Sequence, residues 1–408
     1  MTNHRTDIRD PWGSAYPADV EDDWGPDDWN DDDRPARDGH ATRREGPPTA
    51  LDAPAALVAA YERGWQPADV LHVTKRSLEP AFADPAAALI LRESHCSDAW
   101  SRAPRQWLDQ LRAIADAHPG ADTDPTADRD PGIDPSHGWP LARFWQTLGP
   151  WTALCPPPSA WPRQRTDPAP ERDTDPAVAD TKVLNKIRGL LAKAESTEFT
   201  EEAETLTAKA QELMTRYAID SALLEAATPG SSITVHSKRI HLDNPYVKQK
   251  ALLLTAIGEA NQVQTVFNLR LAIATTIGSP VDLAQVEMLF TSLLVQATRA
   301  MHTAGEKGSR SVSFRKAFLF GFAVRIGQRL TEAGKAATAQ AVSESQVRFA
   351  DLLPILADRA DAVHAEVTRL FGPVKTMRNS AVDPRGLRAG RSAADAANLG
   401  DGGRAIAG

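Results

Sequence analysis

The feature that most constrains the fold is a stretch of helical periodicity between Lys182 and Leu224. Its first part places apolar side chains on one arc of a helix, at Val183, Leu184, Ile187, Leu190, Leu191 and Ala194. Three lysines line up on the opposite side, at Lys182, Lys186 and Lys193. The residues from Ser196 to Phe199 break this pattern, which predicts that a first helix ends there.

A second helix is predicted from Thr200, whose hydroxyl suits an N-cap, with Glu201 and Glu202 near the positive end of the helix dipole. Asp220 is in turn predicted to cap a third, short helix. The second helix has a narrow seam formed by Ala203, Leu206, Ala210, Leu213 and Tyr217. Together these patterns predict a helical hairpin that buries its seam on itself or on a partner.

The same residues carry a family resemblance. The matching features are Lys186-Ile187-Arg188, Leu190-Leu191-Ala192, Ala194-Glu195-Ser196-Thr197, Glu202-Ala203-Glu204, the run from Ala208 to Met214, and Tyr217 with Ile219-Asp220. In these features the segment resembles the bacterial and phage family known as domain of unknown function 2786. The resemblance implies a helical hairpin and extends more weakly to about residue 400. It brings no activity, cofactor or catalytic residue with it.

Charge divides the chain into two differently built halves. Residues 1–180 hold 18 Lys and Arg against 32 Asp and Glu, a net charge of −14, whereas residues 181–408 hold 28 against 22, a net charge of +6. All 10 Trp lie at or before Trp161. Two cysteines are too few for a disulfide scaffold. Because the sequence has neither a signal peptide nor a run of apolar residues that could span a bilayer, we expect a cytoplasmic protein without membrane contact.

These differences predict a mostly α protein, with an N-terminal all-α module and a C-terminal α+β domain whose small antiparallel sheet is covered by helices. Strands are expected in 233–242, 263–267 and 269–277, and helices in 280–303, 314–330 and 353–371. The predicted segments are a disordered acidic tail (1–50), a Trp-containing all-α module (51–160, with a linker at 119–137), a Pro/Asp linker (161–180), the hairpin (181–226), an α+β region packed with it (227–372) and a mostly flexible tail (373–408, with a possible short helix around 389–397).

The best candidate for function is the predicted helix 314–330. Phe314, Phe318 and Phe322 share an arc of roughly 100° with Arg315, Arg325 and Arg329, and Lys316 is adjacent. Phenyl and guanidinium groups side by side suit a phosphate backbone with splayed bases, and the lysines at 182, 186 and 193 could extend such a surface. The alternative is structural, because a helix that is apolar on nearly every side is usually buried.

Two features of the N-terminal half can likewise be interpreted as either functional or structural. Trp24 and Trp29 lie among aspartates, which suggests either a motif that docks on the chain's own positive half or a solvating tail. The segment 57–76 could be a helix-turn-helix DNA reader or an ordinary helical hairpin.

Signals for catalysis are weak. The run Ser94-His95-Cys96-Ser97-Asp98 has the residue types of a nucleophile triad, but triad members come from separated segments. His236 and His241 are five residues apart on an expected strand, so they face opposite sides and suit no common metal ion. No catalytic residue, metal site or cofactor is therefore predicted. The leading hypothesis is a non-enzymatic binding or adaptor protein whose positive C-terminal domain engages nucleic acid or another anionic partner. The alternatives are an enzyme with an unrecognised site and a self-associating structural module.

Overall fold

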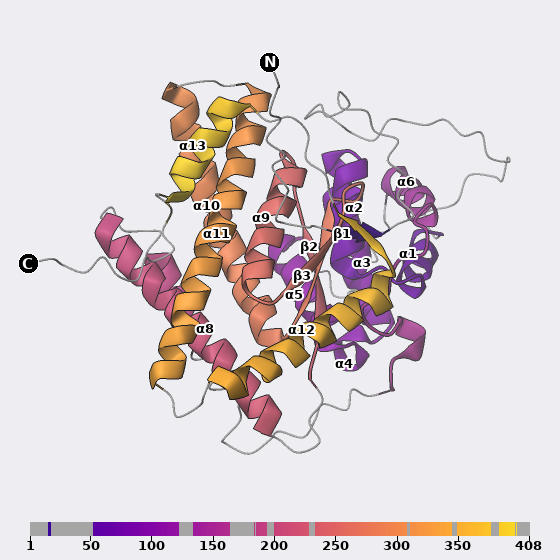
Figure 1. The fold of residues 1–408 in the computed structure, drawn as a ribbon. Coiled ribbons are helices and arrows are strands. Elements are labelled where there is room, and N and C mark those ends of the chain that lie inside the picture. The colour runs from indigo at the N-terminus through magenta and orange to yellow at the C-terminus, as the bar shows by residue number, and fades with distance from the viewer. Residues whose placement is uncertain are drawn as a thin grey trace, which may run out of the picture. The chain divides into compact units, whose positions relative to one another are not determined.

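The structure, a computed structural model, describes residues 15–17, 52–121, 134–163, 183, 185–193, 200–227, 233–307, 311–344, 349–376, 383–395 and 397 (Figure 1). The chain forms two compact units. The N-terminal unit comprises residues 32–172, and the C-terminal unit comprises residues 173–408 together with residues 1–31.

The described part of the N-terminal unit is all α. Its helices are α1 (Asp52–Glu62), α2 (Pro67–Ser77), α3 (Ala83–Cys96), α4 (Ala99–Arg102), α5 (Arg105–Ala117) and α6 (Pro135–Gln146), with 3-10 turns at Pro80–Phe82 and Pro158–Ala160. Large aromatic side chains fill the core: Trp107 packs edge-on against Tyr61 and Trp161, and Trp145 donates its indole N–H to the Thr74 hydroxyl. This confirms the predicted all-α module.

The helix-turn-helix interpretation of 57–76 finds no support in this unit. Gly64, with φ +96°, makes the turn between α1 and α2, and a Cβ there would collide with the Trp151 carbonyl. Helix α2 contacts α3, α5 and α6, and its residues from Val70 to Thr74 are all buried. A recognition helix needs an open face for the DNA groove, and α2 lacks one.

The C-terminal unit is built on a small sheet with strand order β2-β4-β3-β1-β5. Strands β2 (His236–His241), β4 (Ile273–Gly278) and β3 (Gln264–Asn268) form the predicted antiparallel core of the sheet. The β3–β4 turn is held by Asn268, whose Oδ1 accepts from the Leu271 N–H. Strand β1 (Ala15–Pro17) pairs parallel with β3 and antiparallel with β5 (Val374–Thr376).

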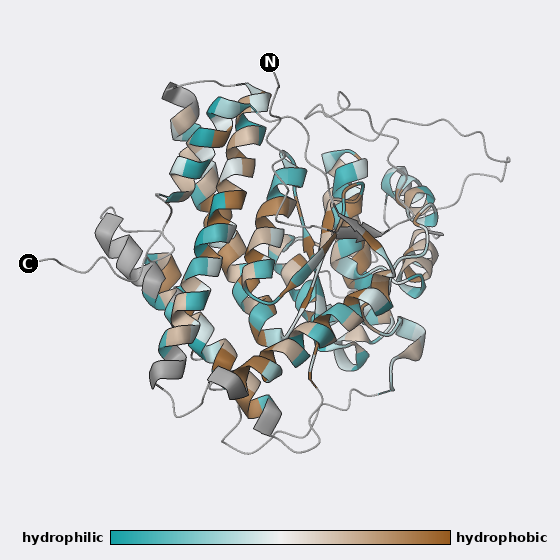
Figure 2. Cartoon of the chain, viewed as in Figure 1, coloured by the Kyte–Doolittle hydropathy of each residue, from teal (hydrophilic) through white to brown (hydrophobic). Residues whose placement is uncertain are grey.

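Helices cover both faces of this sheet. They are a segment at 185–193, α8 (Thr200–Ala227), α9 (Val247–Ala260), α10 (Pro280–Lys307), α11 (Val312–Glu344), α12 (Phe349–Phe371) and α13 (Pro384–Asp395). Phe267 and Ala274 face the main core with α9, α10 and α11, whereas Val266 and Ile277 face α12 through Val363 and Val367. Brown and teal residues alternate around these helices in Figure 2, as helices with one buried side require. The predicted α+β region is confirmed.

The hairpin differs from its prediction in one respect. Ile187 and Leu191 pack with Ala210 and Met214 in the main core, so the two helices bury their apolar sides within the unit. The expected third helix at Asp220 is wrong, because α8 continues without a break to Ala227. Asp220 is exposed in mid-helix and is followed by buried Ala222, so the helical pattern continues past it.

Two expectations about the tails also need correction. The sequence predicts a mostly flexible segment at 373–408 with at most a short helix from 389, yet a full helix, α13, begins at Pro384 and packs along α11. It also predicts disorder throughout residues 1–50, yet 15–17 form β1 in the sheet. Both segments are too short for their own sequence to indicate the structure that they form, because contacts with distant parts of the chain stabilise them.

The packing of α13 on α11 leads to a stability prediction. A Cβ at Gly390 would overlap the Phe318 carbonyl, so Gly390→Ala must push α13 away from α11. We expect a loss of about 1–3 kcal/mol, the usual cost of overpacking. Gly334→Ala is the matched control: a Cβ there meets no atom within 4 Å, so it should stabilise α11 by about 0.5–1 kcal/mol.

Unfolding of the C-terminal unit should be followed by far-ultraviolet circular dichroism, because no Trp lies between residues 162 and 408. Seven of the 10 Trp, from Trp65 to Trp161, lie in the N-terminal unit, so Trp fluorescence reports mainly that unit. If Gly390→Ala unfolds at the same urea concentration as the unchanged protein, the close approach of the two helices is contradicted.

Candidate anion-binding surface

The phenyl groups of the predicted Phe/Arg strip are buried. Phe314, Phe318 and Phe322 are 4%, 0% and 1% exposed, and all three belong to the main core. The prediction of an accessible aromatic strip is therefore wrong, and the structural alternative describes these rings correctly. Stacking of splayed bases on them is excluded as long as α13 stays in place.

Small residues in α13 explain how the strip becomes covered. Gly386, Gly390 and Ala394 recur every four residues and are buried against α11. A Cβ at Gly386 would overlap the Phe314 carbonyl, and on the opposite helix a Cβ at Gly321 would overlap the Leu387 carbonyl. Because neither helix has a side chain at these points, the two backbones lie in direct contact over the phenyl groups.

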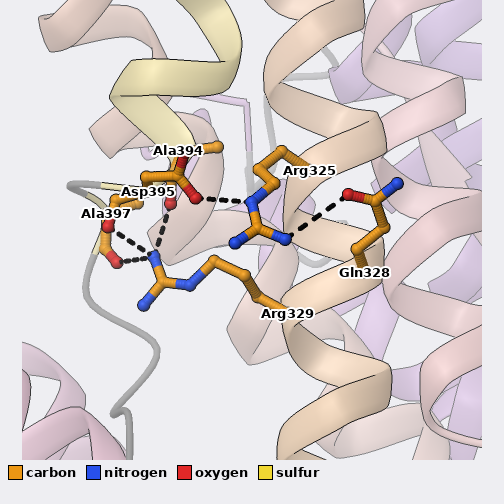
Figure 3. Close-up of polar contacts among 6 residues, drawn as sticks. All are labelled: Arg325, Gln328, Arg329, Ala394, Asp395 and Ala397. Carbon is orange, nitrogen blue, oxygen red and sulfur yellow. Dashed lines mark hydrogen bonds and ion pairs between the residues drawn. The ribbon is translucent and has the colours of Figure 1, made fainter.

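Arg325 and Arg329, two candidates of the predicted strip, are engaged by the C-terminal end of α13 (Figure 3). The Arg325 Nε donates to the carboxylate of Asp395. One guanidinium nitrogen of Arg329 donates to the carbonyls of Ala394, Asp395 and Ala397. The last carbonyls of a helix have no partner within the helix, so Arg329 caps them and also matches the negative end of the dipole. The role that the structure gives these two arginines is to hold α13.

The other predicted residues are dispersed. Arg315 and Lys316 are half-buried near the start of α11. Lys186 and Lys193 are exposed on the helical segment 185–193, opposite the buried Ile187. Lys182, Trp24 and Trp29 lie outside the residues that the structure describes.

The structure reveals a set of cations that the sequence interpretation missed. Arg385, Arg388 and Arg391 are exposed on α13. At 100° per residue they fall within an arc of about 120°, opposite the Gly386/Gly390/Ala394 face. We call these three residues the arginine face. Their three-residue spacing is a sequence signal for one face of a helix. The Gly/Ala/Arg-rich composition around them instead predicts a flexible tail, so the signal is missed.

Both carboxylates of α13 and its cap have partners of their own. The Asp383 carboxylate accepts from the backbone N–H of Arg385 at 2.8 Å and of Gly386 at 3.3 Å, which caps the start of α13. Asp395 binds Arg325 at the other end. Within the described part of the chain, the three side chains of the arginine face have no ion-pair or hydrogen-bond partner, which leaves their charge available to an external anion.

A buried ionic cluster is the other unusual polar feature of this unit. The Ser279 hydroxyl caps the start of α10, where it accepts from the Asp282 backbone N–H at 3.2 Å and donates to the Asp282 carboxylate at 2.7 Å. Arg359 of α12 lies 3.5 Å from the Glu225 carboxylate and donates to the Ala218 carbonyl at 3.3 Å. Burial raises the pKa of Asp282, against the opposing effects of the Ser279 hydrogen bond and of Arg359. These interactions join α8, α10 and α12.

The residue types of catalysis and metal binding are not assembled either. The Ser94 hydroxyl donates to the Leu91 carbonyl at 2.6 Å, so it is engaged by its own helix. Cys96 is an exposed free thiol. Among the described residues, no three His, Cys, Asp or Glu side chains are grouped to hold a metal ion, and no helix is long and apolar enough to cross a membrane.

Comparison with known proteins gives one family. Residues 182–221 match the family described as "Protein of unknown function (DUF2786)". This confirms the resemblance of the hairpin, which in the structure is the segment 185–193 with the first 22 of the 28 residues of α8. No curated protein and no solved structure matches the chain significantly. The match identifies the hairpin as a DUF2786 segment and carries no activity with it.

The raised pKa of Asp282 predicts a pH dependence. A raised pKa in the folded state means that folding favours the protonated acid. The stability that this preference contributes is fully present below the unfolded pKa of about 3.9, and it is lost as pH rises through the folded pKa. The variant Asp282→Asn cannot titrate at this position. Relative to this variant, the unchanged protein should lose stability as pH rises from 4 to 8, as measured by urea unfolding with circular dichroism.

The same series with Asp361→Asn, which replaces an exposed carboxylate on α12, controls for the loss of one negative charge. If the unchanged protein instead gains stability over the Asp282→Asn variant as pH rises, burial is not the dominant influence on this carboxyl group and its assignment is contradicted.

Proposed function

We propose that this protein is a non-enzymatic binding or adaptor protein whose C-terminal unit engages an anionic partner through the arginine face of α13. The observation that carries the proposal is the placement of three unpaired guanidinium groups on the outer side of a helix whose inner side is fixed on α11. An exposed arginine costs little to keep in water, but three aligned ones create a local positive potential, since the carboxylate within their arc, that of Asp395, is already paired with Arg325.

Rigidity supports this role. Close backbone contact and the Arg329 cap restrict α13, so the backbone that carries the arginine face is ordered before a partner arrives. Binding a partner then costs less free energy than it would on a mobile tail, because the backbone of α13 does not have to be ordered. Guanidinium groups also bind carboxylate and phosphate oxygens in pairs of hydrogen bonds, so the chemistry suits either kind of anion.

The acidic N-terminal segment is the proposed intramolecular competitor. Strand β1 attaches residues 15–17 to the sheet of the C-terminal unit, and the sequence that follows contains Asp19, Glu21, Asp22 and Asp23. Tethering these carboxylates to the unit that carries the arginine face raises their effective concentration around it. In this proposal the segment weakens the binding of external anions, so partners with low affinity for the arginine face do not bind.

Retention of the full-length protein on heparin tests the proposal. Replacing Arg385, Arg388 and Arg391 together by Gln should lower the salt concentration needed for elution, because three phosphate- or sulfate-binding charges are lost. The control replaces three arginines of the N-terminal unit, Arg105, Arg112 and Arg143, by Gln and changes the net charge equally. If both variants elute together, net charge alone governs retention and the proposed surface is refuted.

The competing segment gives a separate expectation. Changing Asp19, Glu21, Asp22 and Asp23 to their amides should raise the salt concentration for elution from heparin, because an internal competitor is removed. Amides at Asp122, Asp124, Asp128 and Asp130 change the net charge by the same amount at another place in the chain and should have a smaller effect. Equal effects of the two variants would show that the N-terminal segment does not compete.

A further inference from the structure

We infer that the partner of the arginine face is the phosphodiester backbone of a duplex nucleic acid, bound without regard to sequence. The inference rests on the proposed function, since it names the class of anion that the same three residues bind. It follows from the shape of the surface, from the spacing of its charges and from the side chains that are missing beside them.

Shape excludes small anions as the main partner. The arginine face is the outer side of a helix, so it is convex, whereas small ligands are bound in concave sites that cover most of their surface. Arg385, Arg388 and Arg391 are separated along the helix axis by about 4.5 Å per step and about 9 Å in total. One nucleic-acid strand advances about 3.4 Å along its axis per phosphate, and neighbouring phosphates lie farther apart than this because the strand also winds around the axis. The ridge, extended by the reach of its long arginine side chains, can therefore contact up to about three consecutive phosphates.

The composition of the exposed arc argues against a protein or membrane partner. Pro384, Ser392 and the side chain of Asp395 lie among the three arginines, and the other apolar residues of α13 face α11 instead. Protein interfaces depend on buried aromatic or aliphatic anchors, and a membrane-bound helix inserts its apolar side. Neither is available here. A nucleic-acid backbone, in contrast, can be bound by charge alone.

The burial of the phenyl groups favours a double-stranded over a single-stranded nucleic acid as the partner. Proteins that bind single strands without sequence preference stack the bases on aromatic side chains. Phe314, Phe318 and Phe322 could have provided such a platform, but α13 covers them. The arginine face therefore offers contacts to phosphates and none to unstacked bases, which favours the regular, closely spaced phosphates of a duplex.

The test is a salt titration of the full-length protein with a fluorescent 20-base-pair DNA duplex of arbitrary sequence, read by anisotropy. Three phosphate contacts predict a slope of about −2.7 for the logarithm of the binding constant against the logarithm of salt concentration, or about a 40-fold loss between 50 and 200 mM salt. Each Arg→Gln change on the arginine face should reduce the slope by about 0.9. The Arg105, Arg112 and Arg143 variant should keep the slope of the unchanged protein.

A triple Arg→Lys variant of the arginine face separates charge from folding. It should keep the slope and bind several-fold more weakly, because lysine holds a phosphate through a point charge and loses the paired hydrogen bonds. If the triple Gln variant loses binding and the triple Lys variant also loses the slope, a folding defect explains both results and the assignment to phosphate contacts is overturned.

Two further probes distinguish this inference from the proposed function. Binding of polyglutamate, lost in the triple Gln variant and accompanied by no binding of duplex, would uphold an anion-binding surface and overturn the nucleic-acid assignment. Tighter binding of the single strand than of the duplex would overturn the duplex assignment. No salt-sensitive binding of any of these polyanions would overturn both.

Discussion

Contact between the backbones of α11 and α13 is the interaction on which the account of the C-terminal unit depends. Gly321, Gly386 and Gly390 allow it, since a Cβ at any of them would overlap a carbonyl of the opposite helix. Each glycine costs helix stability in isolation, by roughly 0.5–1 kcal/mol relative to Ala. The cost is offset here because the short distance lets the two helices enclose Phe314, Phe318 and Phe322, whose burial contributes on the order of 2 kcal/mol each.

This contact divides the arginines of the region into two groups with different roles. Arg325 and Arg329 point at the end of α13 and satisfy a carboxylate and three carbonyls, so their charge is used inside the unit. Arg385, Arg388 and Arg391 lie on the far side of the same helix and face outward. A sequence count gives all five the same formal charge. Only the position of α13 shows which of them can meet a partner.

Elements with a strong local periodicity can be predicted from the sequence, whereas elements that depend on contacts with distant parts of the chain are missed. The hairpin, the three antiparallel strands and the long helices have strong patterns of their own, and most of their predicted positions lie close to the observed bounds, although α11 continues to Glu344, well past its predicted end at residue 330. Strand β1 is missed and α13 is only partly predicted, because three or twelve residues carry too little signal and their stability comes from partners distant in the chain. For the same reason the sequence suggests that the phenyl groups of α11 are accessible: what covers them lies about 70 residues downstream.

The most direct test of the account is amide hydrogen exchange of residues 384–395 in the full-length protein, measured by mass spectrometry. If α13 is docked on α11 as described, its amides should exchange with the slow rates of the neighbouring turns of α11, because both must open together. Exchange of 384–395 at the rate of an unstructured peptide would contradict the account, since the phenyl groups would then be uncovered and the arginine face would have no fixed scaffold.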